Sequence, residues 1–150
     1  MTSVTLDTLG ISKEINESGA YASVRKTFAT LAENDREKKH LGAAPTWSIA
    51  SAHAVTEDGS IMIASNTGSQ LPAAAYGADH VIFVVGGQKI VKNVEEGMKR
   101  VYEYVLPLES ERAHKAYGVP GSFVSKILII NKEVEPNRIH IIIVNEVLGF

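Results

Sequence analysis

The sequence predicts a three-layer α/β domain with a mainly parallel sheet. The clearest strand is the apolar run over residues 80–85, which is continuous enough to be buried on both faces, as in a parallel sheet. Two more apolar runs follow, over residues 126–130 and 138–144. Segments with the helical spacing of apolar residues alternate with these strands, and this alternation is typical of α/β folds.

Composition places the chain among ordinary globular proteins. Its 150 residues suit one domain over residues 1–150, and a hydrophobic content of 45% is enough for a core. A net charge of -2 does not indicate a nucleic-acid or membrane-surface binder. The lack of cysteine excludes disulfides and thiolate metal sites. Because neither a signal peptide nor a membrane span is indicated, we expect a cytoplasmic protein.

The first third of the chain is expected to be mostly helical. Ser3 or Thr5 can cap a short helix, and apolar residues three and four apart between positions 21 and 31 mark one face of another. The charge run over residues 34–39 indicates a solvated helix end or loop. Residues 47–55, which are mostly small, are predicted to form one buried strand.

A hairpin and a polar loop form the centre of the predicted domain. Asp58-Gly59 is a strong turn signal between two short strands. The following loop, residues 65–70, carries hydroxyls, amides and Gly68, so its backbone can approach an anionic ligand. A short helix that starts near Pro72 would point its N-terminus at this loop, which favours an anion site. An ordinary surface loop is the alternative.

The second half is predicted to hold two helices and two strands. Asn93 caps a helix that Pro107 is expected to end, Ser110 is expected to cap a second helix, and Gly118 can terminate that one. The polar stretch over residues 131–137 is short enough to make the last two strands a hairpin.

Ligands of such folds bind beyond the carboxyl ends of the strands, so the loops after Ile63, Val85 and Val144 are the expected positions. Lys89 follows one strand end and is either a partner of a phosphate or carboxylate, or a surface lysine. Glu57 is a candidate acid or base, with a solvated turn residue as the alternative. No metal-ligand spacing, P-loop or dinucleotide motif is present, and we expect no cofactor.

Several stretches resemble the LUD (lactate-utilization) domain family: residues 54–60, 66–69, 93–97 and, most specifically, the ending over 138–150. The segment that begins at Ser3 is similar to the family's Gly-Ser-x-Thr-Leu segment. The resemblance implies the fold of the ribose-5-phosphate isomerase and CoA-transferase superfamily. It also implies a link to bacterial lactate oxidation beside iron–sulfur oxidoreductase subunits.

The family's catalytic residues are poorly defined, so the motif positions serve as ligand-site candidates and Glu57 as the catalytic candidate. The candidate ligand-binding residues are Ser3, Thr5, Asn66, Thr67, Gly68, Ser69, Gln70, Gly86, Lys89, His140 and Glu146.

Two departures from the family pattern carry expectations of their own. Longer relatives have an additional N-terminal region, and its absence here would leave a sheet edge that a homodimer can cover. Some relatives carry a cysteine-rich insert, whereas residues 117–122 hold no cysteine, so an iron–sulfur role for this chain is not expected.

Three functions are therefore open. The first is the binding of a small carboxylate or phosphorylated metabolite. The second is an isomerase or CoA-transferase-like activity with Glu57 as base or nucleophile. The third is a non-catalytic subunit whose open sheet edge docks a partner.

Overall fold

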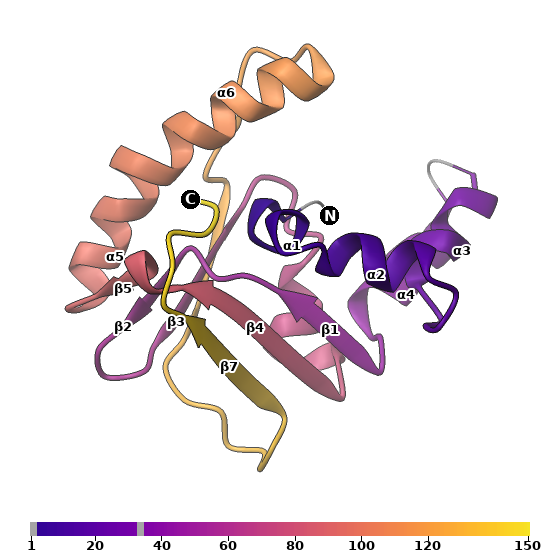
Figure 1. Ribbon diagram of the computed structural model, residues 1–150, viewed down its shortest axis with the longest axis horizontal. Helices are drawn as coiled ribbons and strands as arrows, with labels where there is room; N and C mark the ends of the chain where they lie inside the picture. The colour runs from indigo at the N-terminus through magenta and orange to yellow at the C-terminus, as the bar shows by residue number, and fades with distance from the viewer. Residues whose placement is uncertain (1–2, 33–34) are drawn as a thin grey trace.

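The computed structural model describes residues 3–32 and 35–150 (Figure 1). The helices are α1 (Val4–Thr8), α2 (Ile11–Glu17), α3 (Val24–Thr30), α4 (Arg36–Ala43), α5 (Val94–Arg100) and α6 (Leu106–Tyr117), with the short segments η1 (Ala73–Gly77), η2 (Gly87–Lys89) and η3 (Val101–Val105). The strands are β1 (Trp47–Ala50), β2 (Ala54–Thr56), β3 (Ile61–Ser65), β4 (His80–Gly86), β5 (Ile90–Val91), β6 (Lys126–Ile130) and β7 (Ile139–Val144).

The strands form two sheets. Sheet A has the order β1-β4-β7 and is parallel throughout, so the carboxyl ends of its three strands lie at one edge. Sheet B has the order β5-β2-β3-β6 and is mixed. Its β2–β3 pair is the antiparallel hairpin predicted around Asp58-Gly59. The central strand of sheet A, β4, is the continuous apolar run, and its buried residues confirm the prediction of burial between neighbours.

The core lies between the two sheets and η1. Alternate residues of β4 face it, with Val81, Phe83 and Val85 at 0% exposure. They pack against Val55 and Ile63 of sheet B. Burying large side chains of this kind contributes about 1.5–3 kcal/mol each, which makes this layer the main source of stability.

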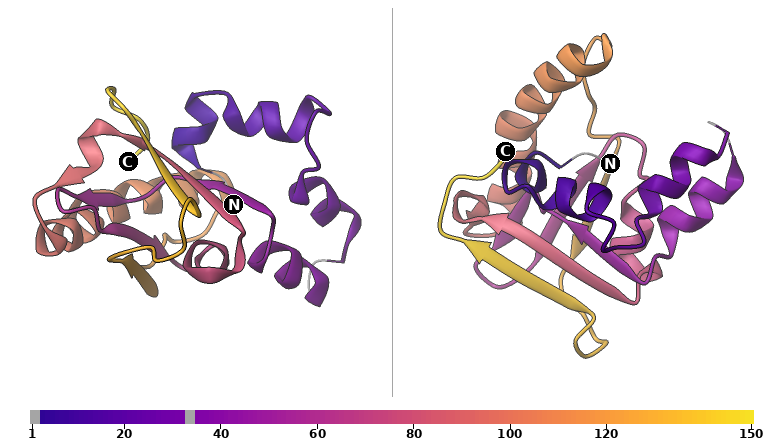
Figure 2. Two further views of the ribbon diagram at one scale, coloured as in Figure 1. Left: turned by 90° about the horizontal axis from the view of Figure 1, so that it is seen from below. Right: turned by 45° about the vertical axis from the view of Figure 1, so that its right-hand side comes forward.

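Helices lie on both sides of the β-structure, which confirms the three-layer α/β architecture. The N-terminal helix α1 contacts β4 of sheet A, and α5 contacts β2 of sheet B. Helices α1 and α2 lie over sheet A, and the long α5–α6 helix runs beside sheet B (Figures 1 and 2).

The predicted capping residues are largely confirmed. The Ser3 hydroxyl accepts a hydrogen bond from the amide of Leu6, and the Asn93 side chain accepts one from the amide of Glu96. Gly118 ends α6 in the left-handed conformation, at φ 67°. In the charge run over residues 34–39, Asn34 lies outside the described residues, and the remainder forms the N-cap and start of α4.

The prediction of one strand over residues 47–55 is wrong. This stretch forms β1 in sheet A and β2 in sheet B, with a break over residues 51–53. The break occurs because the amide of His53 pairs with Met62 O of sheet B, while Ala52 O turns toward Lys89. Small residues fit one continuous strand as well as two strands with a break. The sequence pattern therefore does not reveal that the chain passes from sheet A to sheet B here.

The predicted hairpin over residues 130–138 is also wrong. Strand β6 pairs antiparallel with β3 in sheet B, and β7 pairs parallel with β4 in sheet A. The connection is anchored by Arg138, which is 3% exposed, donates to Ala74 O at 2.8 Å and pairs with Glu133 at 3.1 Å. This buried guanidinium fixes the crossing from one sheet to the other.

Pro107 does not end the helix that starts at Val94, and Ser110 does not cap a second one. The helix continues to Tyr117 through the π-helical segment η3. Pro107 falls in the first turn after η3, where its missing N–H and its ring are tolerated because the preceding turn is widened. The Ser110 hydroxyl instead accepts a hydrogen bond from the amide of Ser122.

Candidate functional site

The strongest candidate site lies at the carboxyl edge of sheet A, around Lys89. This lysine is 2% exposed, and it is the last residue of η2, the short segment that follows β4. Its Nζ donates to Thr5 Oγ1 at 3.1 Å, to Ser51 Oγ at 3.1 Å and to Ala52 O at 3.3 Å. The site therefore joins the first helix, the end of β1 and the end of β4.

The partners of Lys89 are all neutral. Its ammonium forms no ion pair with a residue among 3–32 and 35–150. Burial, and then the positive charge of Arg100, lowers the pKa of Lys89 from 10.5 to about 8. A buried ammonium without a counter-ion is unfavourable, so the site favours either the neutral amine or an added anion.

A second cation adds to this electrostatic environment. Arg100 Nε donates to His53 O at 3.0 Å, and its guanidinium carbon lies 4.8 Å from the centre of the Tyr104 ring. Its Nη2 is buried without a hydrogen-bond partner among the described residues. Burial lowers the pKa of Arg100 as well.

His53 lies between the cations and the polar loop and stays neutral. Burial, and then the charge of Lys89, lowers its pKa from 6.5 to about 4. Its Nδ1 accepts a hydrogen bond from the amide of Ala64 at 3.1 Å, which requires an unprotonated Nδ1. His53 is therefore a hydrogen-bonded core or rim histidine.

The C-terminal segment covers Lys89. Gln88 Nε2 donates to Leu148 O at 2.9 Å and to Gly149 O at 3.3 Å, and its Oε1 accepts from Leu148 N at 3.2 Å. Thr5 Oγ1 donates to the same Leu148 O at 3.2 Å. A Cβ on Gly149 would lie 2.5 Å from Thr5 Oγ1 and 3.5 Å from Lys89 Nζ, so only glycine allows this approach. Figure 1 shows this segment beside α1.

Gly86 makes room for the same cover. A Cβ at this position would lie 2.8 Å from Leu148 N and 2.9 Å from Glu146 O. Glu146 therefore contributes its backbone here, since its O also accepts from Gly87 N at 3.2 Å, while the residue itself is exposed.

The polar loop over residues 65–70 satisfies many of its own polar groups. Ser65 Oγ donates to Gln70 Oε1 and accepts from Gly68 N, both at 2.8 Å. Gln70 Nε2 donates to Ala64 O at 3.2 Å. The amide of Leu71, at the start of the following helical turn, donates to Gly68 O. The loop meets the Lys89 site through Ala64 and His53.

Three more loop residues make local contacts. Asn66 Oδ1 accepts from Ser125 Oγ at 3.2 Å, while Thr67 Oγ1 accepts from Ser69 N at 3.3 Å and donates to Ser69 Oγ at 3.2 Å. Their role in ligand binding stays a prediction.

Two candidates lie on exposed turns and strands. Glu57 is exposed in the β2–β3 turn, where its amide donates to Val91 O at 2.9 Å. His140 is exposed on β7, and its Nε2 lies 2.9 Å from Asn137 O. Their predicted roles stay predictions. Sequence reasoning missed Ser51, Gln88, Arg100 and Gly149. Of these, Gln88 alone had an available signal, because it follows the end of the strand predicted over residues 80–85.

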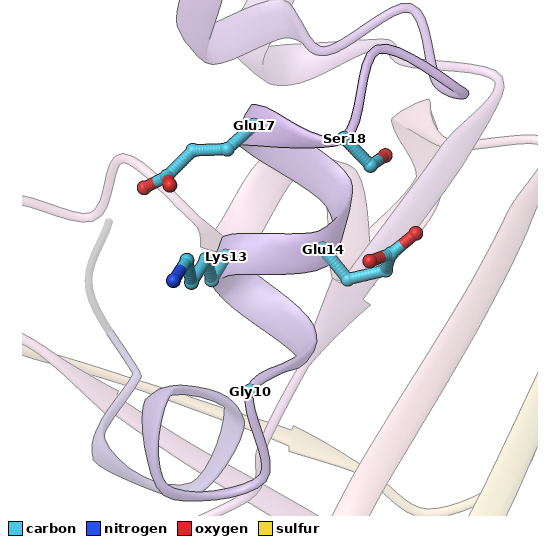
Figure 3. A pocket seen from close by; sticks show the side chains of 5 residues that line it. All are labelled: Gly10, Lys13, Glu14, Glu17 and Ser18. Carbon is cyan, nitrogen blue, oxygen red and sulfur yellow. The ribbon is translucent and has the colours of Figure 1, made fainter.

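A shallow hollow of about 350 Å³ lies along α2, away from the Lys89 contacts. Gly10, Lys13, Glu14, Glu17 and Ser18 line it. Figure 3 shows their side chains spread along opposite sides of the helix rather than converging on one point. This arrangement does not define a binding centre.

Two other classes, a metal site and a membrane span, are not found among the described residues. Within residues 3–32 and 35–150, no three acidic or histidine side chains come together in a way that could hold a metal ion. In the same ranges, no helix combines the length and the apolar character that crossing a membrane requires.

Fold and site together define an α/β domain with a buried lysine at the carboxyl edge of its parallel sheet, which no described residue neutralises. The LUD domain family model matches residues 1–144, and the chain belongs to this family. No curated protein and no solved structure matches the chain. The family's name associates the domain with lactate utilization.

Proposed function

We propose that this domain binds a small carboxylate or phosphorylated metabolite at the Lys89 site, in bacterial lactate or other organic acid metabolism. The supporting observation is that Lys89 is buried among neutral hydrogen-bond acceptors and has no counter-ion in the part of the chain that the structure describes. Its hydroxyl neighbours Thr5 and Ser51 are groups that can also donate to a bound anion. The family's name is consistent with an organic acid as the ligand.

A bound anion would make the burial of the charged Lys89 ammonium favourable. The attraction between ammonium and carboxylate or phosphate offsets the cost of keeping Lys89 charged in the interior. Binding also requires access, and Gln88 and Leu148 now close the site. The cover is held by a few hydrogen bonds to the side chains of Gln88 and Thr5, so its opening costs less than unfolding of the core.

Thermal denaturation in the presence of L-lactate, pyruvate, CoA and ribose 5-phosphate tests the proposal. A true ligand at 100-fold above its Kd is expected to raise Tm by roughly 5–10 °C. The Lys89→Met variant keeps the apolar stem of the side chain but removes its charge, so the same ligand should leave its Tm unchanged.

Lys92→Met is the matched control, because Lys92 is an exposed lysine three residues away. It should retain the full ligand-induced shift. If none of the four compounds stabilises the wild-type domain, or if Lys89→Met responds as the wild type does, the proposal is wrong.

A second candidate is an isomerase or CoA-transferase-like enzyme, and the pKa of Lys89 favours it. With a pKa of about 8, Lys89 carries both amine and ammonium near neutral pH and can act as an acid–base group. Glu57, the residue predicted from sequence, is the competing base.

Incubation of the domain with ribose 5-phosphate or L-lactate in D2O, followed by NMR, tests this activity through loss of the carbon-bound proton. With Lys89 as the acid–base group, Lys89→Met should abolish exchange and Glu57→Gln should leave it within about twofold. The reverse pattern would assign the role to Glu57, and absence of exchange in the wild type would exclude proton abstraction from these two substrates.

A further inference from the structure

Strand β7 is the uncovered edge strand of sheet A. Ile141, Ile142 and Ile143 are 37%, 51% and 52% exposed, so apolar side chains are accessible on both faces of the strand. Figures 1 and 2 show β7 as the outermost strand, with no described element along its free side. An exposed apolar edge of this kind is a site for pairing with another strand.

The backbone groups on the free side follow from the pairing with β4. The amide of Val81 donates to Arg138 O at 2.7 Å, and the pair is parallel with Val81 opposite Ile139. Because backbone groups alternate in direction along a strand, the N–H and C=O of Ile139, Ile141 and Ile143 point to the free edge.

This edge lacks the features that normally prevent pairing. Residues 139–144 include no charged residue, proline or glycine, and His140 is the one polar side chain. The other edge of sheet A, β1, has four residues, and the edges of sheet B are the two-residue β5 and β6, which carries Lys126. Among the described edges, β7 is the longest and the least protected.

We propose that a second copy of this chain pairs with β7, antiparallel, across a two-fold axis at Ile141. In this register Ile141 lies opposite the partner's Ile141, and Ile139 lies opposite the partner's Ile143. All three outward-facing residues then form hydrogen-bonded pairs, so no outward backbone group of β7 between Ile139 and Ile143 is left unpaired. The two copies of sheet A become one six-stranded sheet.

The strand is complementary to itself in charge and in shape. No formal charge meets another over residues 139–144, and the exposed isoleucines cover one another across the axis. His140 lies opposite the partner's Ile142 at a non-hydrogen-bonded pair, where cross-strand side chains approach most closely. This juxtaposition makes the register testable.

Light scattering after size-exclusion chromatography, from micromolar to high micromolar concentration, measures the outcome. The wild type is expected to have twice the mass of the chain. Ile142→Lys should give the single-chain mass, because a charged side chain is placed in an apolar strand pair. Adding His140→Glu should restore the dimer, because each Glu then faces a Lys of the partner chain.

Phe123→Lys, which alters an exposed aromatic residue outside β7, is the matched control and should remain dimeric. Thermal melting confirms that each variant is folded. A second readout uses the lack of cysteine: Ile141→Cys should crosslink to itself on oxidation and Phe123→Cys should not. A monomeric wild type would overturn the proposal and would leave this edge to a different partner. A dimer unaffected by Ile142→Lys, or crosslinking at position 123 alone, would also overturn it.

Discussion

Between pH 8 and pH 10.5 the free energy of unfolding of the unliganded domain is expected to increase by about 3 kcal/mol. The folded state holds the pKa of Lys89 near 8, whereas the unfolded chain has the usual 10.5. In this window the unfolded chain binds more protons, so stability rises with pH. Below pH 8 the cost of burying the ammonium is fully present. Urea denaturation at closely spaced pH values measures the slope.

Lys89→Met is the decisive variant for this prediction. It should be more stable than the wild type at pH 7 by a similar amount, about 3 kcal/mol, and its stability should not rise between pH 8 and pH 10.5. The acid side provides an internal control. The pKa of His53 is lowered to about 4, so stability should fall as pH decreases from 6.5 to 4 in both proteins. A wild-type slope that persists in Lys89→Met would show that another group is responsible.

Gly86→Ala is expected to destabilise the domain by about 1–3 kcal/mol and to displace the C-terminal cover of Lys89. The new Cβ would meet Gln88 Oε1 and lie 2.8 Å from Leu148 N and 2.9 Å from Glu146 O. Two of these contacts are backbone atoms, which cannot rotate away. Urea denaturation measures the loss of stability, and amide hydrogen exchange of Leu148 measures opening of the cover.

Gly87→Ala is the matched control, because a Cβ there meets its nearest neighbour, Val144 O, at an ordinary 3.5 Å. It should retain both stability and protection of the Leu148 amide. If Gly86→Ala behaves in the same way, the segment is not held as the structure indicates.

Residues with strong local signals made much of the fold predictable. The apolar run of β4 specified a buried parallel strand, and Asp58-Gly59 specified the β2–β3 hairpin. The failures came from long-range interactions. Nothing local distinguishes a hairpin from a crossing between sheets at residues 131–138, because the choice depends on the buried contact of Arg138 with Ala74. Pro107 likewise signals a helix end unless a π-helical turn precedes it.

The candidate site was predictable to a similar degree. Position after a strand end was enough to single out Gly86 and Lys89, but the burial of Lys89 depends on partners 84 and 38 positions away, Thr5 and Ser51. The contribution of Gly149 depends on a close approach that no sequence pattern encodes. No local pattern singles out Arg100, because its hydrogen bond to His53 O joins residues 47 positions apart.

If Lys89 receives an anion, the number of protons taken up on binding depends on pH. Calorimetric titration of the best stabilising ligand at pH 7 and pH 9, in buffers of different ionisation enthalpy, measures this uptake. We expect uptake of close to one proton at pH 9 and about 0.1 proton at pH 7, because binding restores the charge of a lysine whose pKa is about 8. The Lys89→Met variant should show no binding. Equal proton uptake at both pH values, or unchanged affinity in Lys89→Met, would show that the anion does not bind at Lys89.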